Sequence, residues 1–332
     1  MTSLSLKRLA VIALPMAALS GMATAVNAQE WTPSRSIEFV APANPGGGWD
    51  TLVRTVSRVI QEEQLSDRNF AAINVPGGGG AVAWAQIARD SGNPHKLFAT
   101  SPPVILVPLA GASRYDHSDF TPVARLITDY SILLVAADSE YETINDLFDA
   151  LRENPNLSIG GGSAPGSMDH ISVAGLASAA GLEASSVNYI PFSGGGDAMT
   201  NLMGGHVEAV ITGAGESVGQ LGEGSQLRAL GVSAPERLSG SLADVPTYQE
   251  QGVDYTFDIW RGVMGAPDMP EEAVAYYEDL FAEMLETDGW QRARDQLGWI
   301  DAYQDSEEFG VFLDEQQELF SSVLSDLGLL RQ

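Results

Sequence analysis

Four glycine-rich turns carry the residues of this sequence whose types and spacing suit the capture of an anion. They read NPGGGWD at positions 44–50, PGGGG at 76–80, GGGSAPGS at 160–167 and SGGGD at 193–197, and none contains lysine or arginine. Glycine lets a ligand approach the main chain closely, and the start of a helix presents unpaired N–H groups at the positive end of its dipole. The pattern therefore predicts an anion site built from main-chain amides.

A carboxylate suits these turns better than a phosphate. The first two turns lack the Lys-Ser/Thr ending of a P-loop, and neither forms GxGxxG with an acidic partner about 20 residues later. A dicarboxylate could lay one planar carboxylate against the amides on each side of a cleft. Neutral hydroxyl donors could be added by Ser101, Ser163, Ser167 and Ser193. A single glycine turn is often a plain strand–helix connection, but three matching turns and a longer fourth favour binding.

Asp50 stands in the first turn of the helix expected after the first glycine turn. There it can cap helix N–H groups and fix the loop. The alternative is that Asp50 accepts a hydrogen bond from a ligand hydroxyl.

The elements that must position these turns alternate between short apolar runs and helical patterns. Strands are predicted at 37–41, 71–75, 96–100, 131–137, 157–160, 187–190, 207–212 and 227–233. Helices are predicted between them at 50–63, 81–91, 144–153, 168–180, 197–203 and 217–221, and in the C-terminal third at 270–287, 290–297 and 306–327, where little strand pattern remains. This alternation predicts an α/β architecture with largely parallel sheets. Ligands of such sheets bind beyond the carboxyl ends of the strands, so the four turns should share one cleft.

The N-terminus has the pattern of a secretory signal peptide. Lys7 and Arg8 precede an uncharged run and a small-residue exit, which predicts a signal peptide over 1–28 with cleavage after Ala28. An uncleaved membrane anchor is the alternative. The sequence has no cysteine, which excludes disulfides, thiol catalysis and a lipid anchor at a processed N-terminal cysteine. We expect a freely diffusing periplasmic protein of a Gram-negative bacterium, without stable membrane insertion after cleavage.

The charge and the remaining residue types exclude several classes of protein. The net charge of −27 becomes about −29 once Lys7 and Arg8 are removed with the signal peptide, so nucleic acid and anionic membranes are unfavourable partners. The acids are scattered and lack calcium-ligand spacing. The sequence has no G-x-S-x-G elbow, and its four histidines are dispersed. We therefore predict no metal, no cofactor and no enzymatic activity; an exported α/β enzyme stays the weaker alternative.

The order of several motifs resembles a known family. FVAPANPGGGWD, NVPGGGGAVAWAQIA, DFTPVARL, GSAPGSMDH and IPFSGGGDAMTNLMGGHVEAVITG resemble the solute-binding proteins of tripartite tricarboxylate transporters, the Bug family, over nearly all of the mature chain. The motif NPGGGWD, with its Trp49, is more similar to the TctC branch of the family, which is associated with citrate-like ligands. The resemblance implies a two-lobed type II periplasmic-binding-protein fold with a hinge of two crossover segments and C-terminal helices packing on the first lobe. Lobe 1 would contain 29–128 plus 257–332, and lobe 2 would contain 129–256.

The resemblance also implies partners and a mechanism. Lobe closure would trap a small organic di- or tricarboxylate, and a permease of a large and a small integral membrane subunit would receive it, driven by an ion gradient. The expected state is a monomer. A sensory role, in which the closed protein is presented to a two-component kinase, is the alternative that the sequence leaves open.

The family pattern places loops 44–50 and 76–80 of the first lobe, and 162–167 and 193–197 of the second, around the ligand. Three roles stay open. Arg261 could bind a third carboxylate of the ligand or form an ion pair. His170 could pack its helix or contact the ligand, and Trp49 and Trp260 could line the cleft or belong to the core. The predicted ligand-binding residues are Asn44, Pro45, Gly46, Gly47, Gly48, Trp49, Asp50, Gly77, Gly78, Gly79, Ser101, Ser163, Gly166, Ser167, Ser193, Gly194, Gly195, Asp197 and Arg261.

Overall fold

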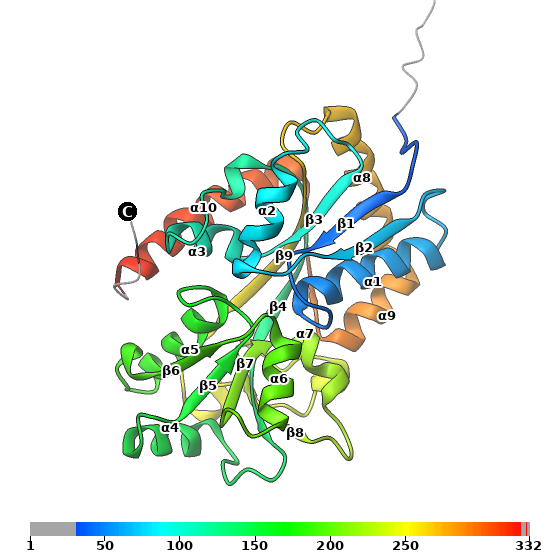
Figure 1. Cartoon of the computed structure of the whole chain (residues 1–332). Helices are drawn as coiled ribbons and strands as arrows, with labels where there is room; N and C mark the ends of the chain where they lie inside the picture. The colour runs from blue at the N-terminus through cyan, green and yellow to red at the C-terminus, as the bar shows by residue number, and fades with distance from the viewer. Residues whose placement is uncertain (1–30, 327–329, 331–332) are drawn as a thin grey trace, which may run out of the picture. The chain divides into compact units, whose positions relative to one another are not determined.

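The computed structural model describes residues 31–326 and Leu330 (Figure 1). The predicted signal peptide, 1–28, lies outside the described residues. The described chain forms two α/β lobes, and the long strand β4 runs from one into the other (Figure 1). This confirms the predicted fold class.

The sheet of the first lobe has the order β2-β1-β3-β9-β4, and β10 pairs with β4 at Arg125, Ile127 and Thr128. β1, β2 and β3 are parallel, and β9 runs antiparallel to both β3 and β4. The strands are β1 Ile37–Ala41, β2 Phe70–Asn74, β3 Lys96–Thr100, β9 Asp258–Gly265 and β10 Ile300–Gln304. The helices are α1 Gly48–Glu62, α2 Ala81–Ile87, α3 Pro103–Leu109, α8 Glu271–Leu285, α9 Asp288–Leu297 and α10 Ser306–Asp326.

The second lobe is built on the other half of β4. That half pairs antiparallel with β7 and β8, and β7 continues the sheet through β5 to β6. The strands are β4 Thr121–Ala136, β5 Ser158–Gly161, β6 Asn188–Pro191, β7 Ala209–Gly213 and β8 Leu227–Val232. The helices are α4 Ile144–Glu153, α5 Met168–Ala179, α6 Gly195–Met203 and α7 Ala214–Ser217.

Each lobe has its own apolar core. The C-terminal helices pack on the first lobe as predicted, because Phe281, Trp290 and Phe309 share one buried cluster with Phe39 of β1. The second lobe has two clusters, one on each face of its sheet, around Ile211 and Val210 of β7. Successive strand residues point to opposite faces, so these neighbours necessarily enter different clusters.

Two strands, the first half of a third strand and one helix were not predicted, and another helix begins earlier than predicted. The expected strand at 131–137 is only the second half of β4, which has 16 residues. β9 and β10 lie in the third of the chain where little strand pattern was recognised, and α3 was missed because its sequence, PVILVPL, begins with proline and contains another. The helix expected at 217–221 begins earlier, at Ala214. The points at which the chain passes between lobes stay a prediction.

The two lobes are joined through paired strands. β4 continues from one sheet to the other, while β9 pairs with β4 from Thr121↔Gly265 to Tyr130↔Asp258. β9 also pairs with β3 of the first lobe. Asp129 of β4 and Arg261 of β9 therefore lie on neighbouring strands where the lobes meet.

Candidate ligand-binding site

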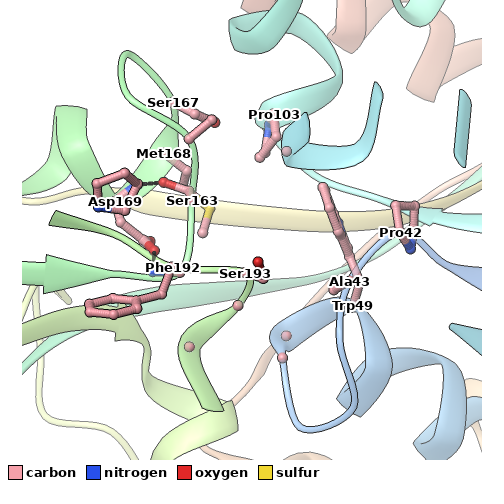
Figure 2. A pocket seen from close by; sticks show the side chains of 18 of the residues that line it. Pro42, Ala43, Trp49, Pro103, Ser163, Ser167, Met168, Asp169, Phe192 and Ser193 are labelled. Atoms are coloured by element: carbon pink, nitrogen blue, oxygen red, sulfur yellow. Dashed lines mark hydrogen bonds between the residues drawn. The ribbon is translucent and has the colours of Figure 1, made fainter. Parts of the chain in front are cut away.

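A cavity of about 280 Å³ lies between the glycine turns of the two lobes. Figure 2 shows Pro42, Trp49 and Pro103 on its first-lobe side and Ser163, Met168 and Phe192 on its second-lobe side. This volume is at the small end of the range for ligand pockets. The helices α1, α5 and α6 begin at the turns that line it, so their unpaired N–H groups are gathered around one space.

Most of the predicted site residues line this cavity. They are Gly47, Gly48, Trp49, Gly77, Gly78, Gly79, Ser101, Ser163, Ser167, Ser193, Gly194, Gly195 and Arg261. Six predicted residues lie outside the lining: Asn44, Pro45, Gly46, Asp50, Gly166 and Asp197. The structure gives several of these six a supporting role in the loops, and their contact with ligand stays a prediction.

Asp50 holds the first glycine turn in place. Its carboxylate accepts hydrogen bonds from Gly46 N (2.9 Å), Arg54 Nε (2.8 Å) and Asn74 Nδ2 (2.8 Å). Burial acts to raise the pKa of Asp50, but the hydrogen bonds from Arg54, Gly46 and Asn74 outweigh it and lower the pKa below its ordinary value. Asp50 is thus a fully paired anion that fixes the loop. The predicted capping of helix N–H groups is not seen, because the main-chain donor to Asp50, Gly46 N, precedes the helix.

Asp197 and His170 support the second-lobe turns in a similar way. Asp197 Oδ2 accepts from Ser193 N at 3.3 Å, and His170 Nδ1 accepts from Gly166 N at 2.9 Å. The His170 ring also stacks on Tyr189, with 4.7 Å between ring centroids. These contacts give His170 the packing role, and burial lowers its pKa.

Asp169 follows the longer second-lobe turn, in the first turn of α5, and was not among the predicted site residues. It is 1% exposed and lines the cavity, behind the Ser163 loop in Figure 2. Its Oδ2 accepts from Gly162 N at 2.7 Å, and its own N donates to Ser163 Oγ at 2.8 Å. Burial, with the charge of nearby Glu216, raises the pKa of Asp169 to about 8, and Gly162 and Arg261 only partly oppose this.

Arg261 forms an ion pair, one of its two predicted roles, whereas its contact with a ligand carboxylate stays a prediction. Its Nη2 lies 2.9 Å from Oδ2 of Asp129, and both side chains are almost fully buried, so it forms an ion pair between β9 and β4. Arg261 also lines the cavity, next to the first glycine turn: a Cβ on Gly48 would lie 2.3 Å from its Nη1. Glycine at position 48 is therefore required by the guanidinium.

Glu216, at the start of α7, also lines the cavity and was not predicted. Its Oε1 accepts from Gly213 N at 3.0 Å and from the Thr212 hydroxyl. Its Oε2 is buried and has no hydrogen-bond partner among residues 31–326. Burial raises the pKa of Glu216, and the charge of Arg261 is the largest effect in the other direction.

The turns of the two lobes approach each other closely above the cavity. A Cβ on Gly47 would lie 3.7 Å from Gly194 Cα, and one on Gly196 would lie 3.2 Å from Gly46 O. A Cβ on Gly79 would lie 3.1 Å from Cβ of Ala164. A Cβ on Gly79 or Gly196 would therefore press against the facing lobe, whereas a Cβ on Gly47 would make an ordinary contact with Gly194.

The two tryptophans differ. Trp49 is 8% exposed, lines the cavity and packs edge-on against Trp84, so it is both wall and core. Trp260 is buried among Phe309 and Phe312 and donates to Gln316 Oε1 at 3.2 Å, so it belongs to the core.

Asp169 could have been found from a repeated pattern. Gly48-Trp49-Asp50 and Ser167-Met168-Asp169 both place an acid two residues after a small residue at a helix start. Besides Asp169, three residues of the predicted loop 162–167 line the cavity without having been assigned a contact: Gly162, Ala164 and Pro165. The lining residues outside the predicted loops are Pro42, Ala43, Pro103, Met168, Pro191, Phe192 and Glu216. Glu216 carries no comparable pattern.

Within the described chain, no group of three or more His, Asp or Glu side chains is arranged to hold a metal ion. Of the helices between residues 31 and 326, none has both the length and the apolar character of a membrane span.

Comparison with known proteins gives a consistent result. Residues 56–329 match the family described as the tripartite tricarboxylate transporter family receptor, TctC. The chain is 30% identical to a protein encoded in the tcbD-tcbE intergenic region of Pseudomonas sp. (strain P51), over 83% of this chain and 80% of that one. Two solved structures share the fold: Rpa4515 of R. palustris with adipate (TM-score 0.80, 23% identity, 89% and 98% of the two chains) and MatC of Rhodopseudomonas palustris with bound malate (TM-score 0.76, 23% identity, 88% and 100%). The match of the family model to most of the chain shows that this protein belongs to the TctC family of tripartite tricarboxylate transporter receptors.

Proposed function

We propose that the protein is a periplasmic receptor that captures a small organic di- or tricarboxylate by closure of its lobes and is not an enzyme. The observation that supports this most directly is the convergence of glycine turns and helix starts from both lobes on one small cavity. Main-chain N–H groups at helix starts stabilise anions without basic side chains. The relatives of known structure with adipate and malate agree with this class of ligand.

Delivery to a permease of a large and a small membrane subunit is the second part of the proposal. It rests on family membership, because receptors of this family are named for their transporter. The chain would act as a monomer after export through its N-terminal signal peptide, and a citrate-like ligand is the first to test.

The decisive experiment is calorimetry with succinate, malate, citrate, tricarballylate, terephthalate and nicotinate, after a thermal-shift screen. Gly47→Val is the matched loss-of-binding variant. Gly47 has an ordinary extended backbone, and a Cβ on it would lie 3.4 Å from Ala43 Cβ and Asn44 O and 3.7 Å from Gly194 Cα, so the additional methyl groups of valine would crowd this narrow space. The larger side chain should hinder both ligand approach and lobe contact, and reduce affinity at least about tenfold, or 1.4 kcal/mol.

Gly219→Val is the control for that variant. A Cβ at Gly219 meets nothing within 4 Å, and the residue is exposed on the second lobe. It should bind like wild type. Undiminished affinity in Gly47→Val, or no carboxylate binding by wild type, would contradict the proposal.

A further inference from the structure

A buried group of charges lies beside the cavity, and acids outnumber bases in it. Its members are Asp129 of β4, Asp169 of α5 and Arg261 of β9, which are buried, and Glu216 of α7, which is partly exposed as a whole although its Oε2 is buried. The single cation, Arg261, donates two hydrogen bonds to Asp129 through Nε and Nη2. Asp169 and Glu216 are therefore left without a cation of their own in a region that binds carboxylates in the proposed function.

Glycine main chain packs directly against these acids. A Cβ on Gly195 would lie 2.6 Å from Glu216 Oε1, and one on Gly213 would lie 3.0 Å from Asp129 Oδ2. A Cβ on Gly161 would lie 2.9 Å from Cβ of Asp169. The acids are thus enclosed by backbone, which removes the water that would otherwise stabilise two negative charges.

The two oxygens of Asp169 have unequal surroundings. Oδ2 accepts the short hydrogen bond from Gly162 N, whereas Oδ1 is buried with no partner among the described residues. A neutral carboxyl group has one acceptor oxygen and one O–H donor, which matches this arrangement. An ionised carboxylate would leave a buried, negatively charged oxygen unpaired.

The other titratable groups near Asp169 do not supply a counter-charge. Glu216 acts on it unfavourably and Arg261 favourably, but Arg261 is shared with Asp129. Tyr189 of β6 is buried beside it, and the pKa of Tyr189 is raised by burial and by Asp169. His170, the next residue, is stacked on Tyr189, and burial lowers its pKa, which favours its neutral form.

We propose that Asp169 binds ligand as a neutral acid, donating its Oδ1–H to the carboxylate that faces the second lobe. The inference deepens the proposed function and rests on it. A dicarboxylate would be held at its first-lobe end by main-chain amides and at its other end by this proton. No covalent step is involved; the ligand is bound together with a proton that stays on the protein.

Affinity should therefore fall as Asp169 ionises. The carboxyl groups of succinate, malate and citrate ionise below pH 7, so they stay charged from pH 7 to pH 9.5. Only the protonated fraction of the protein is competent, so the dissociation constant of succinate should rise about tenfold or more from pH 7 to pH 9.5. Calorimetry at pH 9 in buffers of different ionisation enthalpy should show uptake of about one proton per succinate. Malate and citrate serve as parallel probes.

Variants separate this effect from general loss of charge. Asp169→Asn cannot ionise, so its affinity at pH 9.5 should exceed that of wild type about tenfold, with a flat pH profile. Asp244→Asn, which removes an exposed acid elsewhere on the second lobe, should keep the wild-type profile. Glu216→Gln removes the neighbouring charge and should move the fall in affinity to lower pH.

The protonation of Asp169 can also be measured without ligand, so that the result does not depend on which acid is used as the probe. The infrared band of a protonated carboxyl group should be present in wild type at pH 6.5, absent at pH 10, and missing in Asp169→Asn. Absence of that band in wild type, or a dissociation constant independent of pH from 7 to 9.5, would overturn the inference while leaving the proposed function intact. Failure of all six acids named under the proposed function to bind at any pH would overturn both.

Discussion

The glycine turns at 44–50 and 160–167 place one aspartate each at the start of a helix, and the two aspartates have opposite environments. Asp50 and Asp169 are both nearly fully buried, at 3% and 1% exposure, and each accepts a hydrogen bond from a main-chain N–H of its own loop. Asp50 also has Arg54 and Asn74 as donors. Asp169 has Glu216 nearby instead.

The consequence is that one local pattern produces two chemical properties. The pKa of Asp50 is lowered, so the first-lobe turn is fixed by a permanent, neutralised charge. The pKa of Asp169 is raised to about 8, so the second-lobe turn carries an acid whose charge depends on pH near neutrality. The neighbours supplied by the fold, and not the helix position alone, decide which outcome occurs.

The largest expected effect comes from Asp169→Asn. The unfolded chain ionises this residue near pH 4, but the folded chain keeps the proton to about pH 8, so folding stability falls as pH rises between those values. The variant has no ionisable group at position 169 and therefore lacks this dependence of folding stability on pH. From pH 5 to pH 8 the free energy of unfolding of the variant, relative to wild type, should increase by about 3 kcal/mol. Denaturant titrations of ligand-free protein at both pH values measure this change. If variant and wild type differed in free energy of unfolding by the same amount at both pH values, the contrast between Asp169 and Asp50 would be contradicted.

Asp50→Asn should act in the opposite direction. The amide would direct an NH₂ group at donors that now converge on a carboxylate, and hydrogen bonds to a charged group are worth about 1.5–3 kcal/mol. We expect the free energy of unfolding at pH 7 to fall by about 2 kcal/mol. Because the pKa of Asp50 is lowered, this advantage of wild type should be lost only as pH falls below the ordinary aspartate value.

Asp197→Asn is a matched control for that substitution. Asp197 lies in the third such turn but is only half-buried, and its main-chain hydrogen bond from Ser193 is long, at 3.3 Å. Its effect on unfolding should stay below about 1 kcal/mol. Similar losses of unfolding free energy for the two variants would show that the Asp50 carboxylate does not stabilise its turn more than Asp197 does.

The fold was largely predictable, and the failures have physical reasons. Runs such as IEFVA and amphipathic patterns such as that of α1 gave the correct elements because local periodicity records which face is buried. β9, with the sequence DIWRGVMG, was missed because two glycines and a buried arginine are unusual in a strand. Gly262 is required there by long-range packing, since a Cβ would lie 2.7 Å from Ala124 O of the neighbouring strand. Long-range packing leaves no local pattern.

The cavity was predictable where glycine marks a close approach, and less so where distant segments meet. Gly47, Gly78 and Gly194 were recognised from their turns and do line it. Glu216 could not be placed, because it reaches the cavity only through the pairing of β7 with β4. The partner of Arg261 was likewise unpredictable, since Asp129 lies 132 residues away along the chain.

The smallest effect should follow Arg54→Ala. The guanidinium is half exposed, so its ion pair with Asp50 is weakened by solvent, and the loss should be at most about 1 kcal/mol in the free energy of unfolding. Arg58→Ala, which breaks an exposed pair with Glu62 one turn later on the same helix, is the matched control at about 0.3–0.5 kcal/mol. Gly46 N and Asn74 would still hold the Asp50 carboxylate after Arg54 is removed. Arg54→Ala could instead lower the free energy of unfolding as much as Asp50→Asn does. Asp50 would then depend on this one cation, and its contrast with Asp169 would come down to the presence or absence of Arg54.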